Sequence, residues 1–401
     1  MRCLLHIGTE KTGTTLLQEW LYANKSALSE NRIALSQTIG FPNNRKFSAY
    51  FQDELDDFHA RHQIRTNKDR ERYFDGFLDE FAEEIAALSA DHDVMVISSE
   101  HFHSRVHQRD SVVALAKFLN AHFDRVDVVC YFREQSDVHK SLYSTALKSG
   151  SVVPVEKFIP RLSPANVYFN YLTMFEVWAD VFGDDNLQAV LYDRAGFQDR
   201  DLRRDFLSRI DPQLDPDLLD YEIETANEKF SLLEANLTRL INRLQPDMQS
   251  NGEINPLREG LLALLSSMSE LKIGTISTGR QVEIYEMFDE SNRAFFKRFF
   301  GVEDNLFKPP STEVDQDDWR EVRDFTALEA QLIELVFAMA DSDVAPRLAS
   351  PDVDLLRDMA LKYEGDATLS KDDAIALMRL ARSSRPNGPT IVKKLREWTE
   401  S

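Results

Sequence analysis

The chain opens with an apolar strand that runs directly into a glycine-bounded loop. Residues 3–7 read Cys-Leu-Leu-His-Ile, Gly8 and Gly13 bound the loop, and an amphipathic helix is expected from Thr14. This order of strand, tight loop and helix gathers backbone N–H groups and the positive end of a helix dipole around one point. The segment therefore predicts a phosphate-binding loop at the end of the first strand of an α/β fold.

The loop differs from the nucleotide-binding P-loop G-x-x-x-x-G-K-[ST] at one position. Gly8, Gly13 and Thr15 fit that pattern, but Thr14 occupies the place of the lysine that reaches the outer phosphates of ATP. The lysine of this loop is Lys11, which lies inside it. The cation is therefore expected beside a different part of the ligand, which favours a nucleotide but disfavours ordinary Mg-ATP chemistry.

A second strand ends in an arginine. Residues 126–132 form a continuous β-branched and aromatic run, Arg133 follows it, and Ser141 comes eight residues later in a helical segment. Eight residues make a little over two helical turns, so Ser141 returns to the face that Arg133 overhangs. A guanidinium fork and a hydroxyl suit a terminal phosphate, although an isolated arginine in this position is more often a surface ion pair.

Together these segments resemble the cofactor motifs of sulfotransferases that use 3′-phosphoadenosine 5′-phosphosulfate (PAPS). The family's 5′-phosphosulfate loop reads approximately x-x-G-x-x-K-[ST]-G-T-T, and the matching residues are Gly8, Lys11, Thr12, Gly13, Thr14 and Thr15. Arg133 and Ser141 match the family's 3′-phosphate site. The resemblance to the bacterial members covers about residues 1–300. It implies a central parallel sheet, PAPS as cofactor with 3′-phosphoadenosine 5′-phosphate (PAP) as product, and no required metal.

The sequence gives a weaker indication of the residues that would contact the adenosine of the cofactor. Tyr192 lies at the end of the strand expected at residues 187–193 and matches a family tyrosine near the adenosine, but a strand-end tyrosine equally caps a core. Small-molecule members often stack a tryptophan on adenine directly after the paired threonines, where this chain has Leu16. Phe230 is a candidate substitute.

A further buried-type strand, which begins at Val94, delivers acid and base groups to the edge where ligands bind in such sheets. Glu100, His101 and His103 follow it. Sulfuryl transfer needs a group that accepts the acceptor's proton, and the resemblance allows either Glu or His. Glu100 is the first candidate base, His101 the second and His103 the third. Glu100 alternatively caps a helix or pairs with Arg105, and His103 is alternatively a surface residue.

Composition narrows the class of protein. The 401 residues carry a formal net charge of -21, which opposes nucleic-acid binding and mildly favours a neutral or cationic acceptor. No apolar run reaches the length of a membrane span, and the chain starts at a core strand, so the cytoplasm is the expected compartment. Cys3 and Cys130 lie in predicted strands and read as buried free thiols rather than as a disulfide or metal site.

Helices separate the predicted strands, as in a parallel sheet. They are expected at residues 14–23, 70–88, 110–122, 230–244, 256–271 and 281–300. Residues 149–170 read as a long loop on the acceptor side. A catalytic domain is expected over residues 1–310 and a helical extension over 311–401, with helices at 325–339, 353–363 and 371–382. The extension is a candidate for interaction or homo-oligomerisation.

The sequence therefore predicts a PAPS-dependent sulfotransferase acting on the hydroxyl or amine of a small-molecule, lipid or carbohydrate acceptor. Lys11 is expected at the leaving oxygen, with Thr14 and Thr15 at the 5′-phosphate. Two alternatives stay open: a P-loop kinase, which needs Mg²⁺ and ATP, and a non-catalytic PAPS-binding module.

Overall fold

A computed structural model describes residues 1–158, 162–222, 230–247, 255–267, 280–310, 350–362, 371–385 and 388–400. These residues fall into two compact units. The first contains residues 1–145, 154–222 and 280–310, and the second contains residues 146–153, 230–247, 255–267 and the described residues from 350 onward. The predicted domain boundary at residues 310 and 311 borders residues 311–349, which lie outside the described part.

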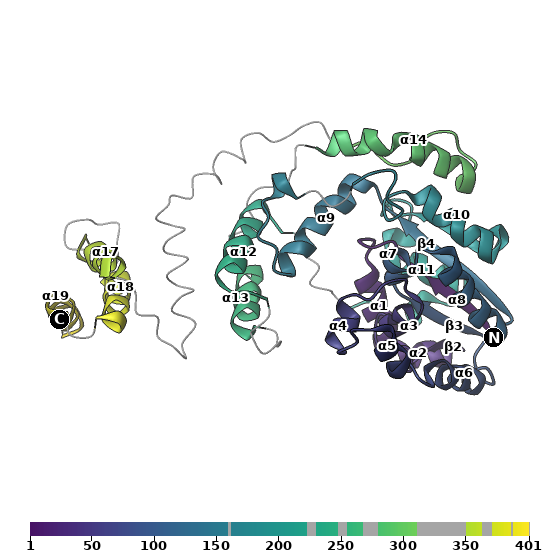
Figure 1. Ribbon diagram of the computed structural model, residues 1–401, viewed down its shortest axis with the longest axis horizontal. Coiled ribbons are helices and arrows are strands. Elements are labelled where there is room, and N and C mark those ends of the chain that lie inside the picture. The colour runs from purple at the N-terminus through teal and green to yellow at the C-terminus, as the bar shows by residue number, and fades with distance from the viewer. Residues whose placement is uncertain are drawn as a thin grey trace. The chain divides into compact units, whose positions relative to one another are not determined.

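The first unit is built on one parallel sheet of five strands (Figure 1). Its strands are β1 (Arg2–His6), β2 (Ile33–Leu35), β3 (Val94–Ser98), β4 (Arg125–Phe132) and β5 (Leu187–Leu191). The spatial order is β2-β3-β1-β4-β5, with every neighbouring pair parallel. The predicted α/β fold is confirmed. The three-residue strand β2 was not predicted, because three apolar residues show no period.

The strand order places a switch point between β1 and β4. From β1 the chain moves to β2 and β3 on one side, and then crosses to β4 and β5 on the other. Ligands of open α/β sheets bind at the carboxyl ends of strands where the order reverses in this way. The predicted loop follows β1 and Arg133 follows β4, so both predicted phosphate sites lie at this point.

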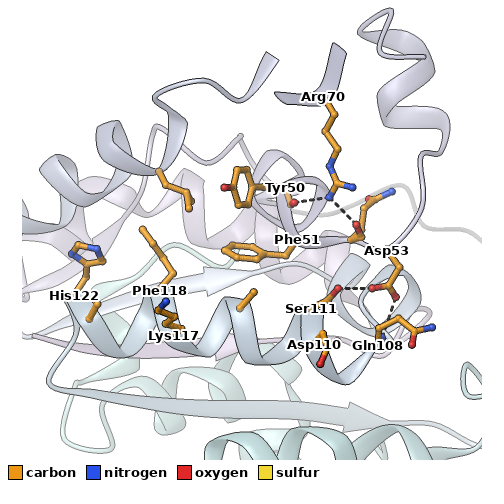
Figure 2. Close-up of a pocket in the computed structure, with 14 residues that line it drawn as sticks. Tyr50, Phe51, Asp53, Arg70, Gln108, Asp110, Ser111, Lys117, Phe118 and His122 are labelled. Carbon is orange, nitrogen blue, oxygen red and sulfur yellow. Dashed lines mark hydrogen bonds between the residues drawn. The ribbon is translucent and has the colours of Figure 1, made fainter. Parts of the chain in front are cut away.

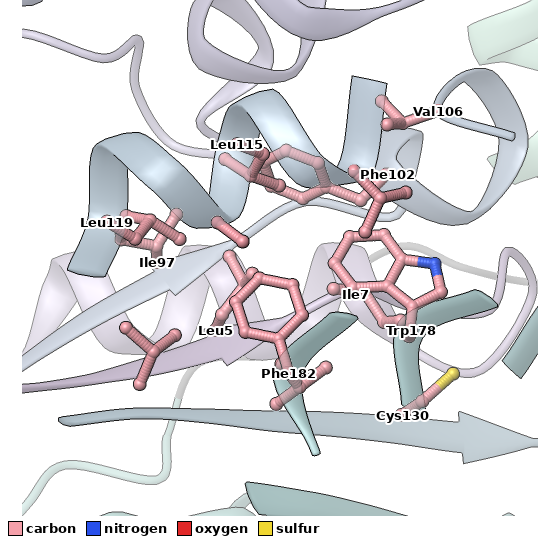
Figure 3. Packing of buried hydrophobic residues seen from close by; sticks show 14 of the residues in the cluster. Leu5, Ile7, Ile97, Phe102, Val106, Leu115, Leu119, Cys130, Trp178 and Phe182 are labelled. Atoms are coloured by element: carbon pink, nitrogen blue, oxygen red, sulfur yellow. The ribbon is translucent and has the colours of Figure 1, made fainter. Parts of the chain in front are cut away.

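Helices cover both faces of the sheet. One face is covered by α6 (Phe77–Leu88), α8 (Arg109–His122), α10 (Tyr171–Phe182) and α14 (Gln281–Phe300), and the other by α1 (Thr14–Ala23), α2 (Lys25–Glu30) and α11 (Leu202–Ile210). Leu5 of β1 and Ile7, directly after it, pack toward Leu115 and Trp178 on the first face (Figure 3). Leu4 faces the opposite cluster, as the two-residue period of a strand requires.

Shorter elements complete the first unit. They are α3 (Arg45–Phe51), α4 (Asp57–Arg61), α5 (Asn67–Tyr73), α7 (His101–Arg105) and α9 (Gln135–Lys148), with 3-10 turns at Val155–Lys157, Asp184–Asn186, Gln198–Arg200 and Pro216–Leu218. The single helix predicted over residues 70–88 is wrong. The chain instead forms α5 and α6, separated at Gly76, whose φ of 72° lies in the left-handed region that ends a helix.

The second unit is helical in its described part. Helices α12 (Leu232–Leu244) and α13 (Pro256–Ser267) pack together around Ile241 and Leu265. The buried Arg258 donates to the backbone oxygens of Leu147 and Lys148 at 3.2 and 2.6 Å. Helices α17 (Ser350–Leu361), α18 (Lys371–Ser384) and α19 (Pro389–Glu400) share another apolar core. The helix predicted at 325–339 lies outside the described residues.

Two further predictions concern single features. Cys3 and Cys130 are free and buried in β1 and β4, as predicted, and burial raises the pKa of both thiols. Within the described ranges, no helix combines the length and the hydrophobicity needed to cross a membrane.

Candidate functional site

The loop after β1 is held against β4 by backbone hydrogen bonds. The N–H of Thr9 donates to the oxygen of Tyr131 at 2.9 Å, and the N–H of Tyr131 donates to the oxygen of Gly8 at 2.8 Å. The Thr12 hydroxyl donates to the oxygen of Thr9 at 2.6 Å. These contacts extend the β1–β4 pairing into the loop and fix its start.

The end of the loop leaves the first turn of α1 open to a ligand. Gly13 is the N-cap of α1, with φ 76°, and supplies no side chain to the N–H groups of that turn. A Cβ at Gly13 would lie 2.6 Å from Leu202 Cδ2 and 3.3 Å from the Tyr192 hydroxyl, so a larger residue would require Leu202 to move. A helix start without a side-chain cap, directly after a compact loop, is an arrangement that favours anions.

Arg133 joins the loop to the predicted adenosine side. Its side chain is 13% exposed, and Nη1 donates to the backbone oxygen of Lys11 at 3.0 Å. Its Cζ lies 5.7 Å from the centre of the Tyr192 ring, and Nη2 lies 3.4 Å from Asp137 Oδ2. The structure therefore brings together Arg133, Tyr192 and the loop, three features that are far apart in the sequence.

Lys11 crosses to the helix that carries Ser141. Its Nζ donates to the Thr145 hydroxyl at 2.6 Å, and that hydroxyl donates to the backbone oxygen of Ser141 at 3.2 Å. Thr145 lies one helical turn after Ser141 on α9 and was missed in the sequence, although its four-residue spacing from Ser141 indicates a shared face. The cation of the loop thus lies on the same face of α9 as the predicted 3′-phosphate hydroxyl.

Glu100 lies directly against the loop. A Cβ at Gly8 would lie 3.1 Å from Glu100 Cα, so the backbone of the predicted base touches the loop. Glu100 starts α7 but its side chain makes no cap hydrogen bond, and Arg105 pairs with Asp56 instead, with Nε 3.0 Å from Oδ2. Glu100 Oε2 accepts from Gln18 Nε2 at 2.7 Å, and burial raises the pKa of Glu100.

The two neighbouring histidines differ in their surroundings. His103 Nδ1 accepts from the N–H of Glu10 at 3.4 Å, while Nε2 donates to the oxygen of Tyr168 at 2.9 Å. Both ring nitrogens are engaged, so His103 is neutral and holds the loop in place. His101 Nε2 lies 4.0 Å from Glu100 Oε1. Burial lowers the pKa of each histidine to about 4.

A second carboxylate in the loop was missed by sequence reasoning. Glu10 Oε2 accepts from the Tyr168 hydroxyl at 2.8 Å. Burial opposes its ionisation, but hydrogen bonds from Ser104 and Tyr168 and the charge of Lys11 give a net lowering of the Glu10 pKa. Tyr168 belongs to the loop predicted on the acceptor side, and its place beside Glu10 depends on tertiary packing that a sequence pattern does not reveal.

A separate cavity of about 860 Å³ lies away from these residues, between α3, α6 and α8 (Figure 2). None of the predicted site residues lines it. Its two central polar groups serve the fold: Arg70 Nη2 donates to the backbone oxygens of Tyr50 and Gln52 at 2.6 and 2.7 Å, and Asp53 accepts from Ser111 at 2.5 Å. The candidate site is therefore the loop edge. Across the described residues, no cluster of three or more His, Cys, Asp or Glu side chains could hold a metal ion.

Comparison with known proteins adds one relative. An uncharacterized protein of Archaeoglobus fulgidus is 27% identical over 228 residues, which cover 55% of this chain and 57% of that protein. The chain thus spans a little over half the length of the relative that it matches. No family model and no solved structure matches the chain.

Proposed function

We propose that the chain is a PAPS-dependent sulfotransferase. The observation that carries the proposal is the contact between the two matched motifs: Arg133 donates to the backbone oxygen of Lys11 at 3.0 Å, at the switch point of the sheet. One guanidinium therefore lies beside the anion cradle, and Lys11 and Ser141 lie on one face of α9. We assign the cradle to the 5′-phosphosulfate of PAPS, and Arg133 with Ser141 to the 3′-phosphate on the same ribose.

The position of the lysine in the loop also fits PAPS better than Mg-ATP. The loop has no lysine next to Thr15, and its own lysine contacts α9 rather than the first turn of α1. A cation in that place suits the oxygen that bridges sulfate and 5′-phosphate. PAPS, when bound, supplies an activated sulfuryl group.

The residues of the chain then have separate tasks. The N–H groups at the start of α1, with Thr14 and Thr15, hold the 5′-phosphate, while Arg133 and Ser141 hold the 3′-phosphate. Glu100 Oε1, the oxygen that Gln18 leaves open, accepts the proton of the acceptor hydroxyl or amine as its oxygen or nitrogen bonds to sulfur. Lys11 neutralises the charge that PAP takes with it as the bond between sulfur and the bridging oxygen breaks.

Calorimetric binding of PAP to the wild type and to Arg133→Ala tests the proposal. We expect metal-independent binding that falls roughly 10- to 100-fold in the variant, because hydrogen bonds to charged groups contribute about 1.5–3 kcal/mol. Adenosine 5′-phosphosulfate, which lacks the 3′-phosphate, should lose much less. Arg125→Ala is the matched control, because Arg125 is an exposed arginine at the opposite end of the same strand.

Three results would count against the proposal or redirect it. An equal loss for both ligands would contradict the 3′-phosphate assignment. Binding of Mg-ATP without PAP binding would indicate a kinase. PAP binding without sulfuryl transfer to any acceptor in a broad panel of hydroxyls and amines would indicate a binding module.

A further inference from the structure

Gln18 is a buried amide aimed at the proposed base. It lies on α1 one turn after Thr14, and 3% of its surface is exposed. Its Nε2 donates to Glu100 Oε2 at 2.7 Å and lies 3.4 Å from the backbone oxygen of Ser98. Both partners are acceptors, so the amide nitrogen, not its oxygen, must face them.

A chain of polar groups continues behind Gln18. Ser98 Oγ lies 3.4 Å from Gln18 Nε2 and 2.8 Å from His6 Nδ1. Burial lowers the pKa of His6 to about 3, so its ring is neutral, and its Nδ1 shares a hydrogen bond with the Ser98 hydroxyl. His6, Ser98 and Gln18 are each at most 3% exposed. The amide is thus fixed from behind by β1 and β3, whose register pairs His6 with Ser98.

No other side chain in the described ranges makes a hydrogen bond to the Glu100 carboxylate. The charged and titratable groups that face it are Glu10 and Lys11 from the loop, His101 from α7 and Arg45 from α3. Of these groups, His101 approaches the carboxylate with its Nε2 4.0 Å from Oε1. Within the described ranges, the Gln18 amide is thus the side chain that orients the Glu100 carboxylate, which also accepts from the backbone N–H of Glu100 itself.

We infer that Gln18 is the positioning residue of the base, holding Oε2 of Glu100 so that Oε1 stays open to the acceptor. The inference rests on the proposed function only for the role of Glu100, because the contact itself is structural. Since Thr14 and Gln18 lie on the same helix, α1 joins the cradle of the sulfuryl donor to the group that activates the acceptor.

The direct test is a ¹³C NMR titration of the Glu100 carboxyl in the wild type and in Gln18→Met, which keeps the volume but has no donor. Loss of a hydrogen bond to the carboxylate should raise the pKa of Glu100 by about 1. Gln18→Asn is a second variant, whose amide is one methylene too short to reach. An unchanged Glu100 titration in whichever variant folds would overturn the inference.

Kinetic measurements distinguish a role of Gln18 in positioning Glu100 from a general loss of stability. In Gln18→Met we expect kcat to fall roughly tenfold or more, since small misplacements of catalytic groups are costly, while PAP affinity stays within about twofold. Asn24→Leu is the matched control: Asn24 is a buried amide at the other end of α1 that bonds the oxygens of Trp20 and Asp220. It should lower stability without changing the Glu100 titration. If the wild type binds no PAP, the proposed function is wrong. The titration still tests whether Gln18 donates a hydrogen bond to Glu100.

Discussion

Glu100 is the residue on which the proposed chemistry depends most directly. Its Oε2 accepts from Gln18, and no other side chain in the described part of the chain donates to its carboxylate. In Glu100→Gln the amide oxygen still accepts from Gln18, so the local packing is kept while the proton acceptor is lost. We expect sulfuryl transfer to fall by about 10²–10⁴ with PAP affinity nearly unchanged, measured with labelled PAPS and by calorimetry.

Replacing the neighbouring His101 by Gln distinguishes the two candidate bases, Glu100 and His101. His101→Gln should reduce transfer far less than Glu100→Gln, because His101 lies 4.0 Å from Glu100 and does not orient it by a hydrogen bond. The reverse order of effects would assign the base to His101.

The dependence of kcat on pH is a second property of Glu100. Burial raises its pKa above the ordinary glutamate value, and a base must be ionised to accept a proton. Activity should therefore be lost as the pH falls through this raised pKa, and be retained above it. A pH profile of kcat measures the position of that acid limb. An acid limb that persists unchanged in the residual activity of Glu100→Gln would belong to another group.

At the scale of elements, two glycines offer a matched comparison. Gly13 and Gly76 precede α1 and α6 with φ values of 76° and 72°. A Cβ at Gly76 meets nothing within 4 Å, whereas a Cβ at Gly13 would lie 2.6 Å from Leu202 Cδ2. We expect Gly76→Ala to cost about 1 kcal/mol from backbone conformation alone. Gly13→Ala should cost about 1–3 kcal/mol more from overpacking, and should also weaken PAP binding.

Urea unfolding of the two alanine variants measures this difference, with calorimetry for the ligand. Equal costs at both positions would show that the loop yields to a methyl group. The close packing of Gly13 against Leu202 and Tyr192 would then not restrict which residue can occupy position 13 of the loop.

The elements also show what sequence reasoning can reach. Strands β1, β3, β4 and β5 and the residues at their carboxyl ends were predicted, because each strand is a mainly apolar run that is followed by polar residues. The break between α5 and α6 was missed, since apolar residues keep helical spacing across it and only Gly76 marks the turn. Helical period alone does not detect a left-handed backbone.

The predicted site residues and the missed ones differ in a physical way. Lys11, Glu100 and Arg133 belong to segments with recognisable local patterns. The missed residues, Thr145 and Glu10, matter because Thr145 contacts Lys11 and Glu10 contacts Tyr168, each across more than 130 residues of sequence. Such partners are selected by packing between distant elements, which a single sequence does not encode as a spacing.

At the scale of the whole molecule, buried histidines tie stability to pH. His6 and His103 are at most 1% exposed, and burial lowers their pKa values to about 3 and about 4. The unfolded chain binds protons at these sites near pH 6.5, whereas the folded chain does not. Between about pH 6.5 and 4 the unfolded state therefore holds more protons, and stability falls as the pH falls.

Removal of one such histidine should flatten this dependence. His6→Asn keeps an acceptor for the Ser98 hydroxyl but has no titratable group, so it should reduce the loss of unfolding free energy by at most about 1.4 kcal/mol per pH unit. Urea unfolding at several pH values between 7 and 5 measures the slope. Leu5→Ala, in the same buried strand, controls for lower stability and should shift the curve without changing its slope. If His6→Asn keeps the wild-type slope of unfolding free energy against pH, His6 binds a proton equally in the folded and unfolded states. The polar groups behind Gln18 then carry a positive charge at acidic pH.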